Sequence, residues 1–237
     1  MQVVSLTALA LRELWISFRL LLLLGLALAG GMLAAALPQI GGGGSATLAW
    51  AMAVTGIITA SLAGAALADE RQRGRAAWLV VRAVPRSSLV IAWFVALAVP
   101  VVVGLTVAAA LTWLTVEVAS LAELGSTPLD AAAFSTLIAA ATLGVLQALA
   151  AGLLLGTLAR PLVAAPLAGL LSAALLLPPL LFADLPRFLP GSGLGLLARA
   201  EELSRPLSDG LGSLGLGCAI LAALLILAAA FLERAEL

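Results

Sequence analysis

Residues 69–88, DERQRGRAAWLVVRAVPRSS, hold five arginines and two acids. Two long runs without a charged side chain, 40–68 and 88–116, enclose this basic insert. A polar segment between two such runs must lie outside a lipid bilayer, because its charges need water or a protein partner. The insert therefore predicts a chain that crosses a membrane on either side of it.

The amino-acid composition also indicates a membrane protein. Hydrophobic residues make up 63% of the 237 residues and charged residues 10%, with a mean hydropathy of +1.21. Soluble domains contain about 45–50% apolar and about 25% charged residues. Because a bilayer offers the backbone no hydrogen-bond partners, we expect an all-α integral membrane protein that forms a single domain over residues 1–237.

The residue types that the chain lacks exclude several kinds of chemistry. There is no histidine and no lysine, and the net charge is zero. Without histidine there is no histidine-based triad, imidazole metal ligand or histidine proton relay, and we expect no metal site. Without lysine there is no conventional phosphate-binding loop, so any ATP that powers the protein must bind to another chain. The single Cys218 allows no internal disulfide, and nothing points to nucleic acid.

Six uncharged runs are long enough for the roughly 20 residues that a helix needs to cross a bilayer. They predict transmembrane helices at residues 20–37, 46–68, 88–116, 131–159, 161–183 and 210–232. The fourth and fifth must be antiparallel neighbours, because Arg160 alone separates them. Four prolines should kink or break their helices. They are Pro100, Pro166, Pro178 and Pro179.

The N-terminal residues 1–19 have an amphipathic pattern. Apolar residues recur at spacings of three and four, at Val4, Ala8, Leu11, Trp15 and Phe18. This spacing predicts an interfacial helix that lies along the membrane surface. A cleaved signal peptide is the alternative, although its apolar core would be longer than the usual length of about 7–15 residues.

The arginines predict the orientation. With six spans, both termini and the basic insert lie on one side, which then carries nine arginines against three on the other. The nine are Arg12, Arg19, Arg71, Arg73, Arg75, Arg82, Arg86, Arg160 and Arg234. The positive-inside rule makes this side cytoplasmic. We therefore expect a multi-pass inner-membrane protein with cytoplasmic termini, a cytoplasmic loop at 69–87 and an outer loop at 184–209.

The outer loop contains LGLLARAEELS at residues 194–204, after a turn at 191–193. This stretch predicts one short amphipathic helix. Its charges suit a solvated or interfacial cap, and a lid over a substrate exit is the alternative.

Within the basic insert, a helix over residues 71–84 would place four residues on one face, because their positions advance by four, three and four. They are Arg71, Arg75, Trp78 and Arg82. Pro85 disfavours helical geometry in the residue before it, so this short helix should end there. Anchoring to anionic lipid headgroups is one role for such a face, and docking of a protein is the other.

The insert resembles the cytoplasmic coupling loop of type-2 ATP-binding-cassette exporter permeases. The likeness is carried by an acid, a basic residue, a glycine, an apolar run and a proline-basic pair between the second and third spans. Here these are Glu70, Arg71, Gly74, residues 79–81, Pro85 and Arg86. The N-terminal interfacial helix, six spans and large outer loop are similar too. Arg75 stands where the family usually has a threonine, and the gap from Gly74 to Pro85 is longer than is usual in the family.

The resemblance implies a permease subunit that works with ATPase subunits and with a second copy or a sister permease. ATP and Mg would bind to the ATPase, and no cofactor is expected on this chain. The implied coupling residues are Glu70, Arg71, Gly74, Arg75, Trp78, Arg82, Pro85 and Arg86. The alternative is a membrane scaffold or assembly factor that transports nothing and docks a cytoplasmic partner through residues 69–87.

Polar and small residues inside the spans give weaker signals. Thr55, Thr59 and Gln147 are candidates for a substrate path. The threonines could instead bond their own helix, and Gln147 could bond a neighbouring one. Small residues at four-residue spacing, at Gly56, Ala60, Gly64 and Ala68 and at Gly152 and Gly156, predict close helix packing within the subunit or between subunits. 

The middle of each predicted span lacks acids and arginines. This argues against a proton-coupled carrier, because such carriers keep ionisable groups at the midplane. Uncharged spans favour a hydrophobic or amphipathic cargo, such as a drug, lipid or peptide. Direct haem binding is not expected, since the chain has neither histidine nor tyrosine to ligate iron.

Overall fold

The structure of the protein is a computed structural model, and it describes residues 2–36, 44–72, 85, 87–121, 130–182, 189–200 and 202–234. Regular secondary structure in these ranges is entirely α-helical, which confirms the expected class. The helices are α1 (Gln2–Ile16), α2 (Arg19–Ala36), α3 (Gly44–Gln72), α5 (Ser87–Leu121), α6 (Ala131–Leu158), α7 (Pro161–Leu181), α8 (Ser192–Ala198) and α9 (Pro206–Arg234).

Five helices are long and apolar enough to cross a membrane, namely α3, α5, α6, α7 and α9. They coincide with five of the six predicted spans, and by length and composition the chain is a multi-pass membrane protein. The predicted span at 20–37 corresponds to α2, which has only 18 residues. A helix of that length is about 27 Å long, slightly short of a hydrocarbon core of about 30 Å. α1 and α2 qualify only together, as a pair bent by 74° that is either a broken span or a re-entrant loop.

A sharp break separates α1 from α2. Phe18 has a φ of 58°, in the left-handed region that side chains other than glycine rarely adopt. Its N–H donates to the carbonyl oxygen of Trp15 at 3.1 Å, which closes the last turn of α1. Ala10 and Leu14 are buried, and α1 packs against α5. Trp15 and Phe18, which belong to the predicted apolar stripe, are exposed.

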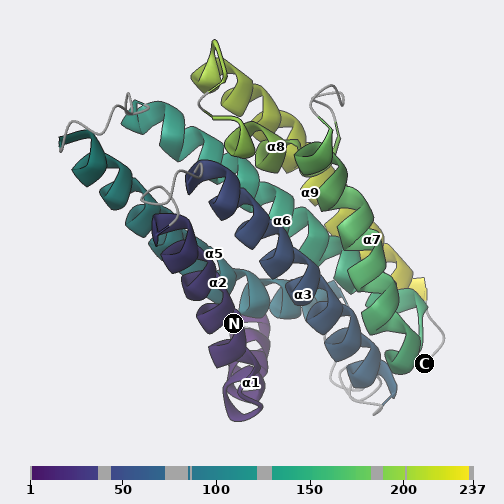
Figure 1. Ribbon diagram of the computed structural model, residues 1–237. Coiled ribbons are helices and arrows are strands. Elements are labelled where there is room, and N and C mark those ends of the chain that lie inside the picture. The colour runs from purple at the N-terminus through teal and green to yellow at the C-terminus, as the bar shows by residue number, and fades with distance from the viewer. Residues whose placement is uncertain are drawn as a thin grey trace.

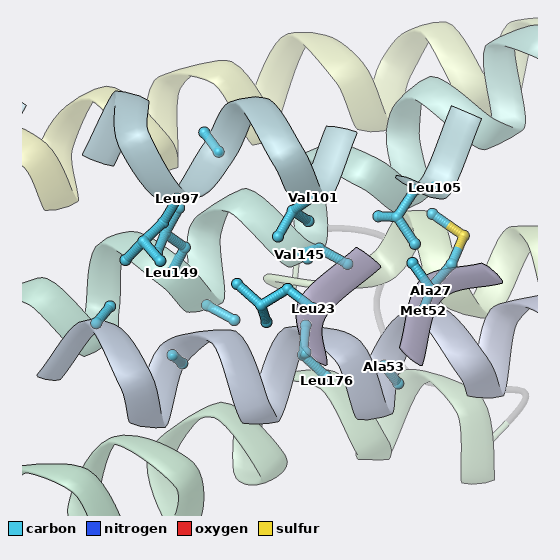
Figure 2. Close-up of a cluster of buried hydrophobic side chains, with 14 of the residues drawn as sticks. Leu23, Ala27, Met52, Ala53, Leu97, Val101, Leu105, Val145, Leu149 and Leu176 are labelled. Carbon is cyan, nitrogen blue, oxygen red and sulfur yellow. The ribbon is translucent and has the colours of Figure 1, made fainter. Parts of the chain in front are cut away.

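α3 and α6 form the centre of the bundle. α3 packs against α6 and α7, α6 packs against α9, and α2 packs against α5 (Figure 1). Figure 2 shows buried side chains from five helices meeting in one cluster. Each helix contributes at least one fully buried residue: Leu23 from α2, Met52 from α3, Leu97 from α5, Leu149 from α6 and Leu176 from α7.

Small residues let α3 and α6 approach closely. A Cβ added to Gly152 would overlap the backbone of Ala60, and one added to Gly156 would lie 2.8 Å from the carbonyl oxygen of Gly64. Glycine lets helix backbones come together where any side chain would hold them apart. We call Ala60, Gly64, Gly152 and Gly156 the glycine seam. The predicted stripes therefore serve packing within the subunit.

The prolines of α5 and α7 lie inside continuous helices. α7 continues past Pro178 and Pro179 to Leu181. The prolines therefore do not break these helices, and a kink, the other expected effect, stays a prediction. The Phe182 N–H still donates to the carbonyl oxygen of Pro178 at 2.9 Å. Proline removes only its own N–H and leaves later donors in place.

α8 is buried rather than lying at a surface, which differs from the predicted cap. It contacts α3, α6, α7 and α9, and Leu194 and Leu197 are fully buried. A Cβ on Gly193 would overlap α6 at Ala140, and one on Gly195 would overlap α7 at Pro179. The helix begins two residues before the predicted stretch, because these glycines allow it to enter between other backbones. Figure 1 places it at the opposite end of the bundle from the end of α3.

Candidate functional site

The C-terminal end of α3 carries the first residues of the basic insert. The helix continues to Gln72, beyond the predicted span end at residue 68. Glu70 is buried and Arg71 is partly buried in this last turn. Arg71 therefore belongs to α3, and the expectation that a separate helix begins there is wrong. Four residues of good or fair helix propensity, with no glycine or proline among them, allow α3 to continue.

Arg71 joins α3 to the end of α6. Its Nη1 donates to the carbonyl oxygens of Gly156, at 3.2 Å, and Thr157. The last four carbonyls of a helix have no partner within that helix, and a cation there also favours the helix dipole. The Ala159 N–H donates to the carbonyl oxygen of Leu155 at 2.8 Å. Arg71 and the Ala159 N–H thus satisfy three of the terminal carbonyls of α6.

A surface cleft of about 430 Å³ lies beside this contact. Among the described residues, its lining consists of Ala68, Arg71 and Gln72 of α3 and of residues 158–161, where α6 ends and α7 begins. Arg160 is exposed and precedes Pro161, the first residue of α7. We call this the corner cleft. Two arginines thus line one cleft. It lies where α3 ends and α7 begins, and Figure 1 shows these two helix ends together at one end of the bundle.

Most of the predicted coupling residues lie outside the described ranges. These are Gly74, Arg75, Trp78, Arg82 and Arg86. Pro85 is described and exposed, and its carbonyl oxygen accepts a bond of 3.0 Å from the Ser88 N–H at the start of α5. The helix predicted up to residue 84, its basic face and its contact with an ATPase stay predictions.

Gln147, near the middle of α6, links three parts of the chain. Its Nε2 donates to the carbonyl oxygen of Gly217 in α9 at 3.0 Å, and its Oε1 accepts from the Gly191 N–H at 3.2 Å. Nearby, the Ser192 and Ser213 hydroxyls are 2.9 Å apart. The small cavity between these groups measures about 10 Å³, about the size for one water. The bonds of Gln147 support the prediction that it contacts a neighbouring helix.

Thr55 and Thr59 are fully buried in α3. Their hydroxyls donate to the carbonyl oxygens of Ala51 at 2.8 Å and of Thr55 at 2.6 Å. Each hydroxyl thus bonds the preceding turn of its own helix, which is a common solution for threonine in an apolar environment. These contacts favour a structural role for Thr55, Thr59 and Gln147, and a role in a substrate path stays a prediction.

The structure adds polar contacts that the sequence did not predict. Arg199 donates from Nη2 to the carbonyl oxygen of Pro179 at 3.2 Å, which ties the end of α8 to α7. Gly191 has a φ of 77°, and its Cα lies against α7 near Leu175. The available signal was the run of glycines at 191, 193 and 195, because glycines that close together in an apolar region indicate close backbone approach as well as a turn.

Within the described ranges, no group of three or more histidine, cysteine or acidic residues could hold a metal ion. No known protein-family model matches the chain, and no curated protein matches its sequence. Functional assignment therefore depends on the residues and their geometry.

Proposed function

We propose that the chain is the membrane-spanning permease subunit of an ATP-driven ATP-binding-cassette exporter. The observation that supports this most is the Arg71 contact. The basic insert continues directly from α3, and its third residue bonds the end of α6. A partner that moves the insert would therefore move α3 and α6 together.

The glycine seam supports transmission over the length of the bundle. α3 and α6 meet backbone to backbone at Gly64 and Gly156, so little flexible side chain lies between them. Such an interface favours movement of the two helices as a unit rather than independent rotation. A nucleotide-dependent partner needs only to contact the insert differently in its two states to shift the bundle between two arrangements.

The proposed assembly contains two ATPase subunits and a second copy or sister permease. ATP and Mg bind to the ATPase, and this chain is not an enzyme. In this proposal α1 is the interfacial helix and α2 is the first of six spans. Both termini face the cytoplasm at the inner membrane. The cargo is hydrophobic or amphipathic, in keeping with the uncharged spans, and its path lies between the two permeases.

Gentle isolation of the complex tests this proposal. An ATPase should remain bound, and its hydrolysis rate should respond to this subunit. Substitutions at Gly74, Trp78 and Arg82 should weaken that response, whereas Arg205→Gln, before α9, should not change it. Absence of a nucleotide-binding subunit, together with normal function of the three insert variants, would contradict the exporter assignment.

A membrane scaffold is the second candidate. It is favoured by the bonds of Thr55, Thr59 and Gln147, all of which lie within the subunit, so that the predicted substrate-path residues serve packing. A scaffold would hold a partner through the basic insert without changing ATP hydrolysis. The same isolation distinguishes the two functions by whether hydrolysis by the bound partner responds to this chain.

Reporter tags test the orientation separately. Tags at either terminus should report the cytoplasm, and a tag near Ser192 should report the outer side. The opposite labelling would reverse the proposed topology.

A further inference from the structure

The corner cleft combines two positive charges with a fixed geometry. Arg71 is held in place by the α6 carbonyls, and Arg160 stands exposed on the other side of the connection. The described residues that line the cleft include no acid. The Nε of Arg71 is buried and has no acceptor in the described structure. Both α6 carbonyls accept from Nη1, so the Nη2 group of Arg71 has no acceptor among the described residues.

The cleft lies at the expected level of lipid headgroups. α3 has 29 residues, and a helix of that length is about 43 Å long, whereas the hydrocarbon core of a bilayer is about 30 Å thick. The ends of such a helix reach the headgroup layer on each side. Ala68, Arg71 and Gln72 lie in the last turns of α3, so the cleft lies in this layer when α3 spans the bilayer.

Exposed apolar side chains adjoin the charged groups. Leu158 in the lining is 55% exposed, and Leu162, two residues after Arg160, is 91% exposed. Val163 beside it is also exposed. A soluble anion would gain nothing from these side chains, whereas a lipid could place its phosphate between the arginines and its acyl chains along the leucines.

We propose that the corner cleft binds the phosphate headgroup of an anionic phospholipid. Arginine suits this ligand because its planar fork donates two parallel hydrogen bonds to phosphate oxygens. Basic pockets between transmembrane helices are a recognised form of lipid site. The bound lipid bridges α3 and the start of α7, which both line the cleft. This lipid site does not depend on the proposal that an ATPase drives the protein.

Native mass spectrometry of the full chain, with any subunits that co-purify, tests the site. The probes are phosphatidylglycerol, phosphatidylcholine, and glycerol 3-phosphate as a soluble competitor. Phosphatidylglycerol should remain bound in preference to phosphatidylcholine. Arg160→Gln should weaken its binding about five-fold, since one arginine near the surface contributes about 1 kcal/mol. Arg160→Lys keeps the charge but loses the two parallel donors of the guanidinium. Its lipid binding should therefore lie between that of the wild type and that of Arg160→Gln.

Arg205→Gln is the matched control. Arg205 is also exposed and also precedes a proline that begins a helix, Pro206 of α9, but it does not line the cleft. Its substitution should leave lipid binding unchanged. Equal binding to wild type and Arg160→Gln, equal loss in both glutamine variants, or equal retention of phosphatidylcholine would overturn the proposal. Displacement of the lipid by equimolar glycerol 3-phosphate would assign the cleft to a soluble anion and overturn the lipid assignment.

Discussion

α3 and α9 are both 29-residue helices that are apolar enough to span a membrane, but they occupy different environments. In α3, 61% of the apolar stretch is buried, against 11% in α9, although α9 is the more apolar of the two. Both contain glycines. A Cβ added to Gly56 or Gly64 of α3 would meet the backbone of α6. One added to Gly212 or Gly215 of α9 would have nothing within 4 Å, although Gly210 and Gly217 on the other face of α9 pack against α6. Hydropathy therefore identifies a span without indicating whether that span lies inside the bundle or at its outside, because lipid is as apolar as a protein core.

The glycine seam should give the largest effect on substitution. Gly152→Ala places a methyl group into the Ala60 backbone, so the free energy of unfolding should fall by about 1–3 kcal/mol, as for other overpacked sites. Thermal unfolding in detergent measures it. Gly215→Ala is the control in open space, where alanine should be neutral or stabilise by up to about 1 kcal/mol. Equal destabilisation by both variants would contradict the contrast between α3 and α9.

The contact of Gln147 with α8 and α9 should give the next effect. Gln147→Leu leaves the buried Gly191 N–H without its acceptor, which costs about 1–3 kcal/mol. Trypsin should also cleave faster after Arg199, because α8 is held less firmly. Thr55→Val is the control, since that hydroxyl bonds only its own helix, and it should change stability by less than about 1 kcal/mol. Unchanged proteolysis of Gln147→Leu would show that the bonds of Gln147 do not hold α8 in place.

The Arg71 contact should have a smaller effect on stability. Arg71→Gln removes a cation from the C-terminal end of α6, which should lower the free energy of unfolding by about 0.3–2 kcal/mol. Arg12→Gln serves as the control, because Arg12 is an exposed arginine on α1. The comparison is made by thermal unfolding at low and high salt. If the two variants unfold alike at both salt concentrations, the bond to α6 contributes nothing measurable.

Thiol labelling sharpens the comparison without changing stability. Cys218 of α9 is exposed, whereas Ser213 on the same helix is buried. A membrane-permeant maleimide should label Cys218 faster than the cysteine of a Ser213→Cys variant that also carries Cys218→Ser. Labelling of purified subunit and of native membranes should be compared. Faster labelling of the buried Ser213→Cys thiol than of Cys218 in the purified subunit would contradict the exposed position of Cys218.

The sequence predicted the helical class and five spans, because uncharged runs of sufficient length have few other solutions in a membrane. It did not predict that α3 continues to Gln72 or that α8 is buried between other helices. Both depend on contacts between distant residues. Arg71 is 85 residues from Gly156, and Gln147 is 44 residues from Gly191. Local periodicity placed Arg71 on a basic face, whereas its side chain bonds a helix end that only tertiary structure brings near.

The glycine seam also has a consequence for how the protein is made. Gly152 is synthesised 88 residues after Gly64, which at about 5–20 residues per second means a delay of roughly 4–18 s. During that time α3 has entered the membrane without α6, and its groove of small residues faces lipid or the insertion machinery. Completion of the bundle must therefore follow insertion of α3. A translational pause before α6 would lengthen the period in which this groove is available to the wrong helix.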